Sequence, residues 1–128
     1  MSIFISIASY RDPELSATVK SLYNNADSPS ELMFCVVSQE LNNKHPDLSW
    51  LGNQIKMIKI HARDAAGVGY ARKIAMENYS GEDYFFQIDS HTRVRKGWDT
   101  DLKNMLSFAQ KDAKTKKVIL SRSEEHTS

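Results

Sequence analysis

The chain has 128 residues, of which 41% are hydrophobic and 26% charged, as expected for one globular domain and not for a disordered or fibrous protein. Seventeen basic and sixteen acidic residues leave a formal net charge of +1, so no charge excess favours nucleic acid or an anionic membrane as a partner. The single cysteine, Cys35, excludes an internal disulfide and a Cys-x-x-Cys zinc site. We expect a small-molecule ligand, with Cys35 as an inert thiol in the core.

The two ends of the sequence lead to further expectations. No apolar run approaches the ~20 residues that cross a bilayer, and the first residues lack the basic and apolar regions of a secretory signal. We therefore expect a cytoplasmic protein. Residues 122–128 contain no apolar side chain and resemble a translated sequencing adapter. We expect them to be a non-native or disordered tail after a domain at residues 1–121, which is itself the first part of a longer protein.

The first half of the chain predicts strand, helix and strand in turn. Residues 3–8 are apolar and β-branched, which favours a strand. Asp12 and Pro13 predict the start of a helix, because aspartate caps free N–H groups and proline suits the first helical turn. An apolar stripe over residues 15–26 supports this helix. The continuous apolar run 32–37 is typical of a strand that is covered on both faces.

The second half continues the alternation. A third strand is predicted at residues 55–60, a helix at 67–79 and a fourth strand at 84–88. A fifth strand begins at residues 118–120. The last predicted helix has an apolar stripe formed by Trp98, Leu102, Met105, Leu106 and Ala109. The order of elements predicts an α/β sandwich with a mainly parallel sheet.

Polar side chains follow four of the predicted strands. In open parallel sheets, ligands bind outside the carboxyl ends of the strands, so these residues are the candidates for a site. They occupy positions 9–12, 38–40, 61–64 and 89–91, and they include arginines, carboxylates and histidines. We expect them to meet at one edge of the sheet.

Asp89, Ser90 and His91 form the sharpest of these motifs. Residues that alternate at the end of a strand can turn to the same side, so Asp89 and His91 are a potential ligand pair. A carboxylate and a neutral imidazole suit Mn²⁺ or a similar ion and leave coordination positions for diphosphate oxygens. The alternative is a capping aspartate beside a surface histidine. The place of the motif after a buried aromatic strand favours the metal site.

Two arginines lie on either side of a glycine turn. Arg63 precedes and Arg72 follows the turn around Gly67, and the start of a helix after a glycine favours an anion. The third glycine of the dinucleotide fingerprint is missing, so NAD is not expected. For Arg72, a phosphate, a structural carboxylate and solvent all remain open as partners.

Five other side chains have competing interpretations. Arg11 either stacks on a base or faces solvent. We interpret Asp12 as a helix cap whatever the function is, and Trp98 as a core residue. His45 and His61 have no convincing metal-ligand spacing and are interpreted as incidental.

Three segments in order resemble one enzyme family. They are residues 3–15 (IFISIASYRDPEL), residues 65–72 (AAGVGYAR) and residues 87–99, which contain QIDSHTR and GWD. Together they resemble the glycosyltransferase family typified by a cytoplasmic hydroxyproline N-acetylglucosaminyltransferase that modifies a ubiquitin-ligase adaptor. The resemblance implies a GT-A (Rossmann-like) fold, of which this chain is the nucleotide-sugar-binding half. It also implies UDP-N-acetylglucosamine (UDP-GlcNAc) as donor substrate, Mn²⁺ or Mg²⁺ as cofactor, and retaining transfer to a hydroxyl acceptor, for which the family suggests protein hydroxyproline.

The resemblance also implies roles for individual residues. Asp89 and His91 match a D-x-H variant of the D-x-D metal motif, similar to that of the mucin-type N-acetylgalactosaminyltransferases. We expect Asp89 and His91 to hold the metal, and Asp89 and Arg72 to act in catalysis. The residues expected to contact the donor are Ser9, Tyr10, Arg11, Arg63, Gly67, Arg72, Asp89 and Ser90.

The chain departs from related sequences at two positions of the glycine turn. Ala66 stands where a basic residue is common, and Val68 stands where a proline is common. We consider Arg63 a substitute for the missing charge. The acceptor-binding half of the family lies beyond this chain, so we expect donor binding and leave its catalytic activity open. The alternatives are a GT-A transferase with another sugar nucleotide and a non-catalytic nucleotide-binding α/β module.

Overall fold

The computed structural model describes residues 2–42, 44–64, 67–113 and 119–122, and for residues 68, 106–113 and 119–122 the backbone alone. The strands are β1 (Ile3–Tyr10), β2 (Leu32–Glu40), β3 (Ile55–His61), β4 (Tyr84–Asp89) and β5 (Ile119–Arg122). The α-helices are α1 (Leu15–Asn24), α2 (Val68–Glu77) and α3 (Trp98–Ala113). Three short 3₁₀ segments connect them: η1 (Pro29–Glu31), η2 (Ser49–Gln54) and η3 (Ala62–Asp64).

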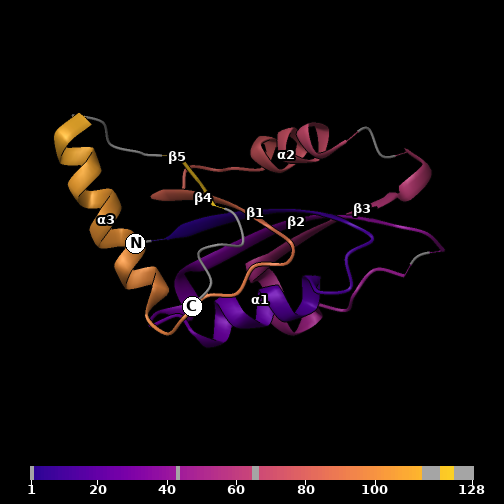
Figure 1. Cartoon of the computed structure of the whole chain (residues 1–128), viewed down its shortest axis with the longest axis horizontal. Helices are drawn as coiled ribbons and strands as arrows, with labels where there is room; N and C mark the ends of the chain where they lie inside the picture. The colour runs from indigo at the N-terminus through magenta and orange to yellow at the C-terminus, as the bar shows by residue number, and fades with distance from the viewer. Residues whose placement is uncertain (1, 43, 65–66, 114–118, 123–128) are drawn as a thin grey trace.

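The strands form one sheet in the order β3-β2-β1-β4-β5, and each of these neighbouring pairs is parallel. Helix α2 covers one face of the sheet and α1 the other, while α3 lies beside the β4–β5 end (Figure 1). This arrangement confirms the predicted α/β, Rossmann-like fold. The connection after β1 leads to β2 and the connection after β4 leads to β5, and these two strands lie on opposite sides of the β1–β4 pair. The gap between the carboxyl ends of β1 and β4 is therefore the topological switch point, where such folds bind ligands.

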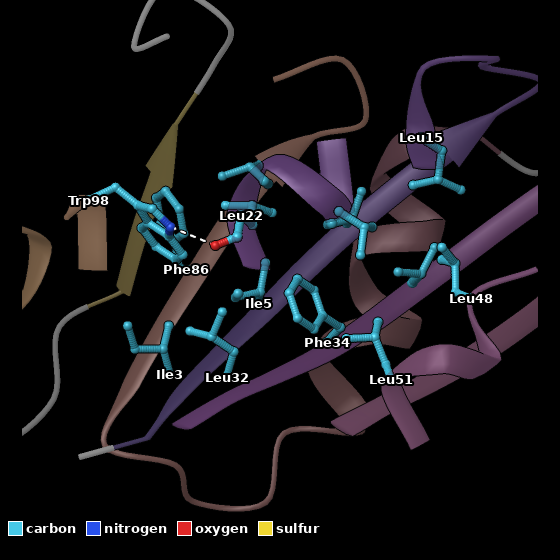
Figure 2. Close-up of a cluster of buried hydrophobic side chains, with 14 of the residues drawn as sticks. Ile3, Ile5, Leu15, Leu22, Leu32, Phe34, Leu48, Leu51, Phe86 and Trp98 are labelled. Atoms are coloured by element: carbon cyan, nitrogen blue, oxygen red, sulfur yellow. Dashed lines mark hydrogen bonds between the residues drawn. The ribbon is translucent and has the colours of Figure 1, made fainter. Parts of the chain in front are cut away.

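The larger core lies between the sheet and α1. Because side chains alternate along a strand, the odd-numbered residues of β1 face this helix. Figure 2 shows the resulting apolar cluster, in which Phe86 of β4 stacks on Trp98 with ring centroids 5.7 Å apart. The indole Nε1 of Trp98 donates a hydrogen bond to the carbonyl of Leu22 at 2.8 Å. The interpretation of Trp98 as a core residue is confirmed.

A smaller cluster packs between the sheet and α2. It contains Phe4, Cys35, Val37, Ala71, Ala75 and Phe85. The fully buried Cys35 confirms the prediction of a core thiol, and burial raises its pKa to about 11, which keeps the thiol protonated and inert.

Several bounds differ from the predicted ones. Strands β1 and β2 run two and three residues further, because the pairing continues through Ser9↔Ser38 and Tyr10↔Gln39 although these residues are polar. In α3, Trp98 and Leu102 are buried as expected, but Met105 is 49% exposed, so its place in the apolar stripe was wrong.

Parts of the predicted elements lie outside the described structure. The side chains of Leu106 and Ala109, residue 118 and residues 123–128 of the expected tail 122–128 are among them. Arg122, the first residue of that expected tail, is the last residue of β5. Within the described part of the chain, none of the helices is long and apolar enough to cross a membrane.

Candidate functional site at the ends of β1 and β4

The residues at the end of β1 lie in two different environments. Ser9 is fully buried, and its hydroxyl has no hydrogen-bond partner among the described residues. Tyr10 is 56% exposed. Arg11 is also exposed, has a positive φ of 51°, and donates its N–H to the carbonyl of Gln39 at 2.9 Å. In this conformation, the side chains of Tyr10 and Arg11 are open to a ligand and that of Ser9 is not.

A surface pocket of about 330 Å³ opens beside Arg11, within the size range of small-molecule sites. It lies between the residues that lead into α1 and the loop after β2. The pocket is lined by Arg11, Asp12, Pro13, Leu15, Ser16, Glu40, Lys44 and Pro46.

Asp89 at the end of β4 is paired with Arg72 of α2. Asp89 is the register partner of Ala8, so its side chain lies on the face of the sheet that α2 covers. Nη2 of Arg72 donates to Oδ1 of Asp89 at 3.3 Å, and the two side chains are 35% and 27% exposed. Of the partners left open for Arg72, the structure therefore shows a carboxylate. The second oxygen, Oδ2, accepts no hydrogen bond from the described residues.

Asp12 contacts both other residues of the Asp89–His91 motif. Its Oδ2 accepts a hydrogen bond from the hydroxyl of Ser90 at 2.6 Å and lies 3.4 Å from Nδ1 of His91. Its Oδ1 accepts the backbone N–H of Glu14 at 2.9 Å. The prediction that Asp12 caps the helix was wrong, because α1 begins only at Leu15 and its N-cap residue is Glu14, without a side-chain cap. Asp12 instead closes the turn that precedes the helix. Burial raises the pKa of Asp12, but the hydrogen bonds from Ser90, Glu14 and His91 together hold it below its usual value.

Helix α1 is linked to the loop after β4 by further hydrogen bonds. The hydroxyl of Thr18 donates to the carbonyl of Ser90 at 2.6 Å and accepts from Nη1 of Arg93 at 2.9 Å. Nη2 of Arg93 donates to Oε1 of Glu14, also at 2.9 Å. Neither Thr18 nor Arg93 has a role predicted from the sequence, although Arg93 belongs to one of the resembling segments. These contacts fix the backbone that carries Ser90 and His91.

The remaining candidates lie near the start of α2. Arg63 is exposed in η3, where its N–H donates to Nδ1 of His61 at 3.1 Å. Gly67 has a φ of 94° and immediately precedes α2, so a residue with a side chain would be strained there. Ala66 and the side chain of Val68, where the chain departs from related sequences, lie outside the described structure.

The comparison with known proteins decides the family. A family model described as Glycosyltransferase (GlcNAc) matches residues 2–50 and 43–125, which is nearly the whole chain. The chain belongs to this glycosyltransferase family. No curated protein matches the sequence. Membership establishes glycosyl transfer as the class of reaction and a nucleotide sugar and an acceptor as the class of partners.

The potential metal ligands of this glycosyltransferase fit one kind of metal site. Among the described residues, no group of three or more His, Cys, Asp or Glu side chains could hold an ion, so a closed zinc site of protein ligands is not present there. Mg²⁺ and similar hard ions are instead held by one or two protein ligands together with substrate phosphates. Asp89, whose Oδ2 accepts no hydrogen bond from the described residues, and the partly exposed His91 have side chains of the types that such sites use.

The third resembling segment has a structural role in the glycosyltransferase. Asp99 is buried, and its carboxylate accepts the N–H groups of Asp27 and Ser28 at 2.8 and 3.0 Å. Gly97 has a φ of 79° and donates its N–H to the carbonyl of Asn25 at 2.7 Å. These bonds link the start of α3 to the chain that follows α1.

Thr18 and Thr92 offer a matched test of the link between α1 and the loop. Both are buried, but within the described part of the chain the hydroxyl of Thr92 has no hydrogen-bond partner, whereas that of Thr18 has two. We expect Thr18→Val to lower the free energy of unfolding by about 1–2 kcal/mol, because it leaves a buried carbonyl unpaired. Thr92→Val should leave stability unchanged or raise it. Urea unfolding of the two variants measures both, and equal effects would contradict the role of Thr18.

Proposed function

We propose that this chain binds UDP-GlcNAc between the ends of β1 and β4 and supplies the donor half of a metal-dependent, retaining glycosyltransferase. One observation carries the proposal. The Arg72–Asp89 ion pair and the Asp12–Ser90–His91 cluster lie at neighbouring strand ends, at the switch point of the sheet. This combines a cation, a carboxylate and an imidazole at the edge where such folds bind nucleotides.

The pocket beside Arg11 is the proposed place for the uridine. The guanidinium of Arg11 can stack on a base, and the exposed ring of Tyr10 offers a second surface for stacking. Both residues belong to the end of β1, so a base held there brings the diphosphate toward the end of β4, the neighbouring strand. For Ser9, the proposed contact with uridine requires a rearrangement that exposes its side chain.

The diphosphate is proposed to lie against Asp89, Ser90 and Arg72. Asp89 and His91 would hold Mn²⁺ or Mg²⁺, and such an ion neutralises the charge that develops on a departing UDP. The guanidinium of Arg72 lies within 3.3 Å of Asp89 and contributes fixed positive charge beside the same group. Arg63 and the N-terminus of α2 after Gly67 add positive potential on this side of the sheet.

The acceptor side of the proposal rests on the resemblance. We propose a hydroxyl acceptor, with protein hydroxyproline as the first to test, in a cytoplasmic setting. The chain is tested first for binding of the donor.

Titration calorimetry with UDP tests the donor site directly. We expect UDP to bind at least tenfold more tightly with Mn²⁺ than with EDTA, because the ion joins two negatively charged groups. ADP should bind at least tenfold more weakly than UDP under the same conditions. Equal affinity for ADP and UDP would favour a generic nucleotide-binding module, and metal-independent binding of UDP would contradict the proposed ion site.

A further inference from the structure

Arg11 has a backbone conformation that costs free energy. Its φ of 51° lies in the left-handed region, which the Cβ atom of any residue other than glycine disfavours. Residues in this region persist only where their surroundings hold them, and they are common at sites that bind ligands. We infer that Gln39 is a positioning residue, whose buried amide holds this strained turn and so presents Arg11 to the donor. This inference rests on the proposed function, which makes Arg11 a contact of the uridine.

Two hydrogen bonds join the end of β1 to Gln39. The backbone N–H of Arg11 donates to the carbonyl of Gln39 at 2.9 Å, and Nε2 of the Gln39 side chain donates to the carbonyl of Ser9 at 3.0 Å. The backbone is therefore held on both sides of Tyr10, whose register partner is Gln39. One residue of β2 thus restrains the chain at the point where β1 leaves the sheet.

The side chain of Gln39 has little freedom to move away from this contact. It is only 2% exposed, and its register partner in β3, Ile60, packs against the cluster between the sheet and α2. A buried amide group costs free energy unless it makes hydrogen bonds. Among the described residues, the partner of Nε2 is the carbonyl of Ser9. This bond therefore fixes the Gln39 side chain and the end of β1 together.

The turn places three consecutive residues along one pocket. Arg11, Asp12 and Pro13 all line the pocket of about 330 Å³ that we propose for the uridine. If Arg11 relaxed to a negative φ, the chain would leave β1 in another direction, and all three residues would move relative to the pocket. A turn that is already held in place lowers the cost of ordering it when a ligand binds.

Gln39→Met removes the side-chain donor and keeps a side chain of similar length. The matched control is Gln54→Met, because Nε2 of Gln54 also donates to backbone carbonyls, those of Pro29 and Leu32 at 2.8 and 3.0 Å. These contacts lie near the starts of β2 and β3, at the opposite end of the strands from Arg11. Both variants lose hydrogen bonds to the backbone, but only Gln39→Met loses one beside the strained turn.

The conformation of Arg11 is read by nuclear magnetic resonance in the chain without ligand. A positive φ brings the amide and α protons of one residue close together, which gives a strong nuclear Overhauser effect between them. We expect this strong effect for Arg11 in the wild type and in Gln54→Met, and a weaker one in Gln39→Met. UDP affinity in the presence of Mn²⁺, measured by titration calorimetry, should fall about tenfold in Gln39→Met and less than about twofold in Gln54→Met.

A double-mutant cycle shows whether Gln39 acts through Arg11. Arg11→Ala removes the guanidinium that the turn presents. In that background, Gln39→Met should lower UDP affinity by less than about twofold more, because residues that act as one unit have non-additive effects. A further loss of about tenfold in the double variant would show that Gln39 acts on UDP by another route, and would overturn the inference.

The remaining outcomes separate this inference from the proposed function. If Gln39→Met retains either the strong Overhauser effect at Arg11 or the UDP affinity of the wild type, the role of Gln39 is overturned. Failure of both the wild type and Gln54→Met to bind UDP with Mn²⁺ would instead overturn the proposed function. If Gln39→Met does not fold, Gln39→Asn keeps the amide on a shorter side chain, which withdraws the donor from the carbonyl of Ser9, and it should give the same losses.

Discussion

Asp89→Asn is expected to weaken the binding of UDP in the presence of Mn²⁺ by at least about a hundredfold, or roughly 2.7 kcal/mol. The substitution keeps the size of the side chain but removes the negative charge, and with it the stronger of the two proposed ligands. It also removes the partner of Arg72, which lies 3.3 Å away. In a homologue with measurable transferase activity, the same change should lower the rate of transfer by at least about a hundredfold.

The effect of Asp89→Asn without metal has the opposite sign. With EDTA present, UDP should bind the variant as well as or better than the wild type, because Arg72 no longer shares its charge with a carboxylate. Asp64→Asn is the matched control, since it removes an exposed carboxylate from η3 after β3. Calorimetric titrations of both variants, with and without Mn²⁺, give four affinities. A loss in Asp89→Asn that is equal with and without Mn²⁺ would exclude Asp89 from the ion site.

The fold could be predicted from the sequence because its signals are local. The apolar run 32–37 and the β-branched residues 3–8 each identify a strand without reference to the rest of the chain. Because these strands alternate with helices, the rules for connecting them allow only a few topologies. The observed topology, a parallel α/β sheet, is one of these. Met105 was misplaced because periodicity identifies the face of a helix but not how far a neighbouring element covers it.

The candidate site could be predicted only in part. The rule that ligands bind at strand ends identified Asp89, His91 and Arg11, which do lie at one edge of the sheet. It could not show that Asp12 reaches Ser90 across 78 residues, or that Arg93 joins Thr18 across 75, because no spacing in a sequence encodes such contacts.

Ser9 illustrates a second limit, that of register. It was expected to follow β1, but β1 continues to Tyr10 because its pairing with β2 continues. Inside a strand, the alternation of side chains places Ser9 on the face that α1 covers, where it is fully buried, and Tyr10 on the other face. A shift of two residues in the end of one strand therefore changes which side chains a ligand can reach.

Arg72→Met is expected to have two opposite effects on binding. UDP affinity in the presence of Mn²⁺ should fall about thirtyfold, or about 2 kcal/mol, which is within the range for a hydrogen bond to a charged group. Mn²⁺ affinity without UDP should rise about two- to fivefold, because Asp89 loses the guanidinium that competes with the ion. This second effect is the smaller one, since the pair is about one-third exposed and solvent screens it.

The test does not depend on the stability of the variant, because UDP affinity and Mn²⁺ affinity are expected to change in opposite directions. A variant that is merely less well folded would lose both affinities. Methionine retains a flexible apolar stem in α2, and Arg72→Lys retains the charge without the planar fork, so its UDP affinity should lie between those of Arg72→Met and the wild type. Lys73→Met is the control for loss of an exposed cation from α2, and it should leave Mn²⁺ affinity unchanged. If Arg72→Met left the UDP affinity within twofold of the wild type, the arginine would be a partner of Asp89 only, and the diphosphate would have to lie elsewhere along the ends of β1 and β4.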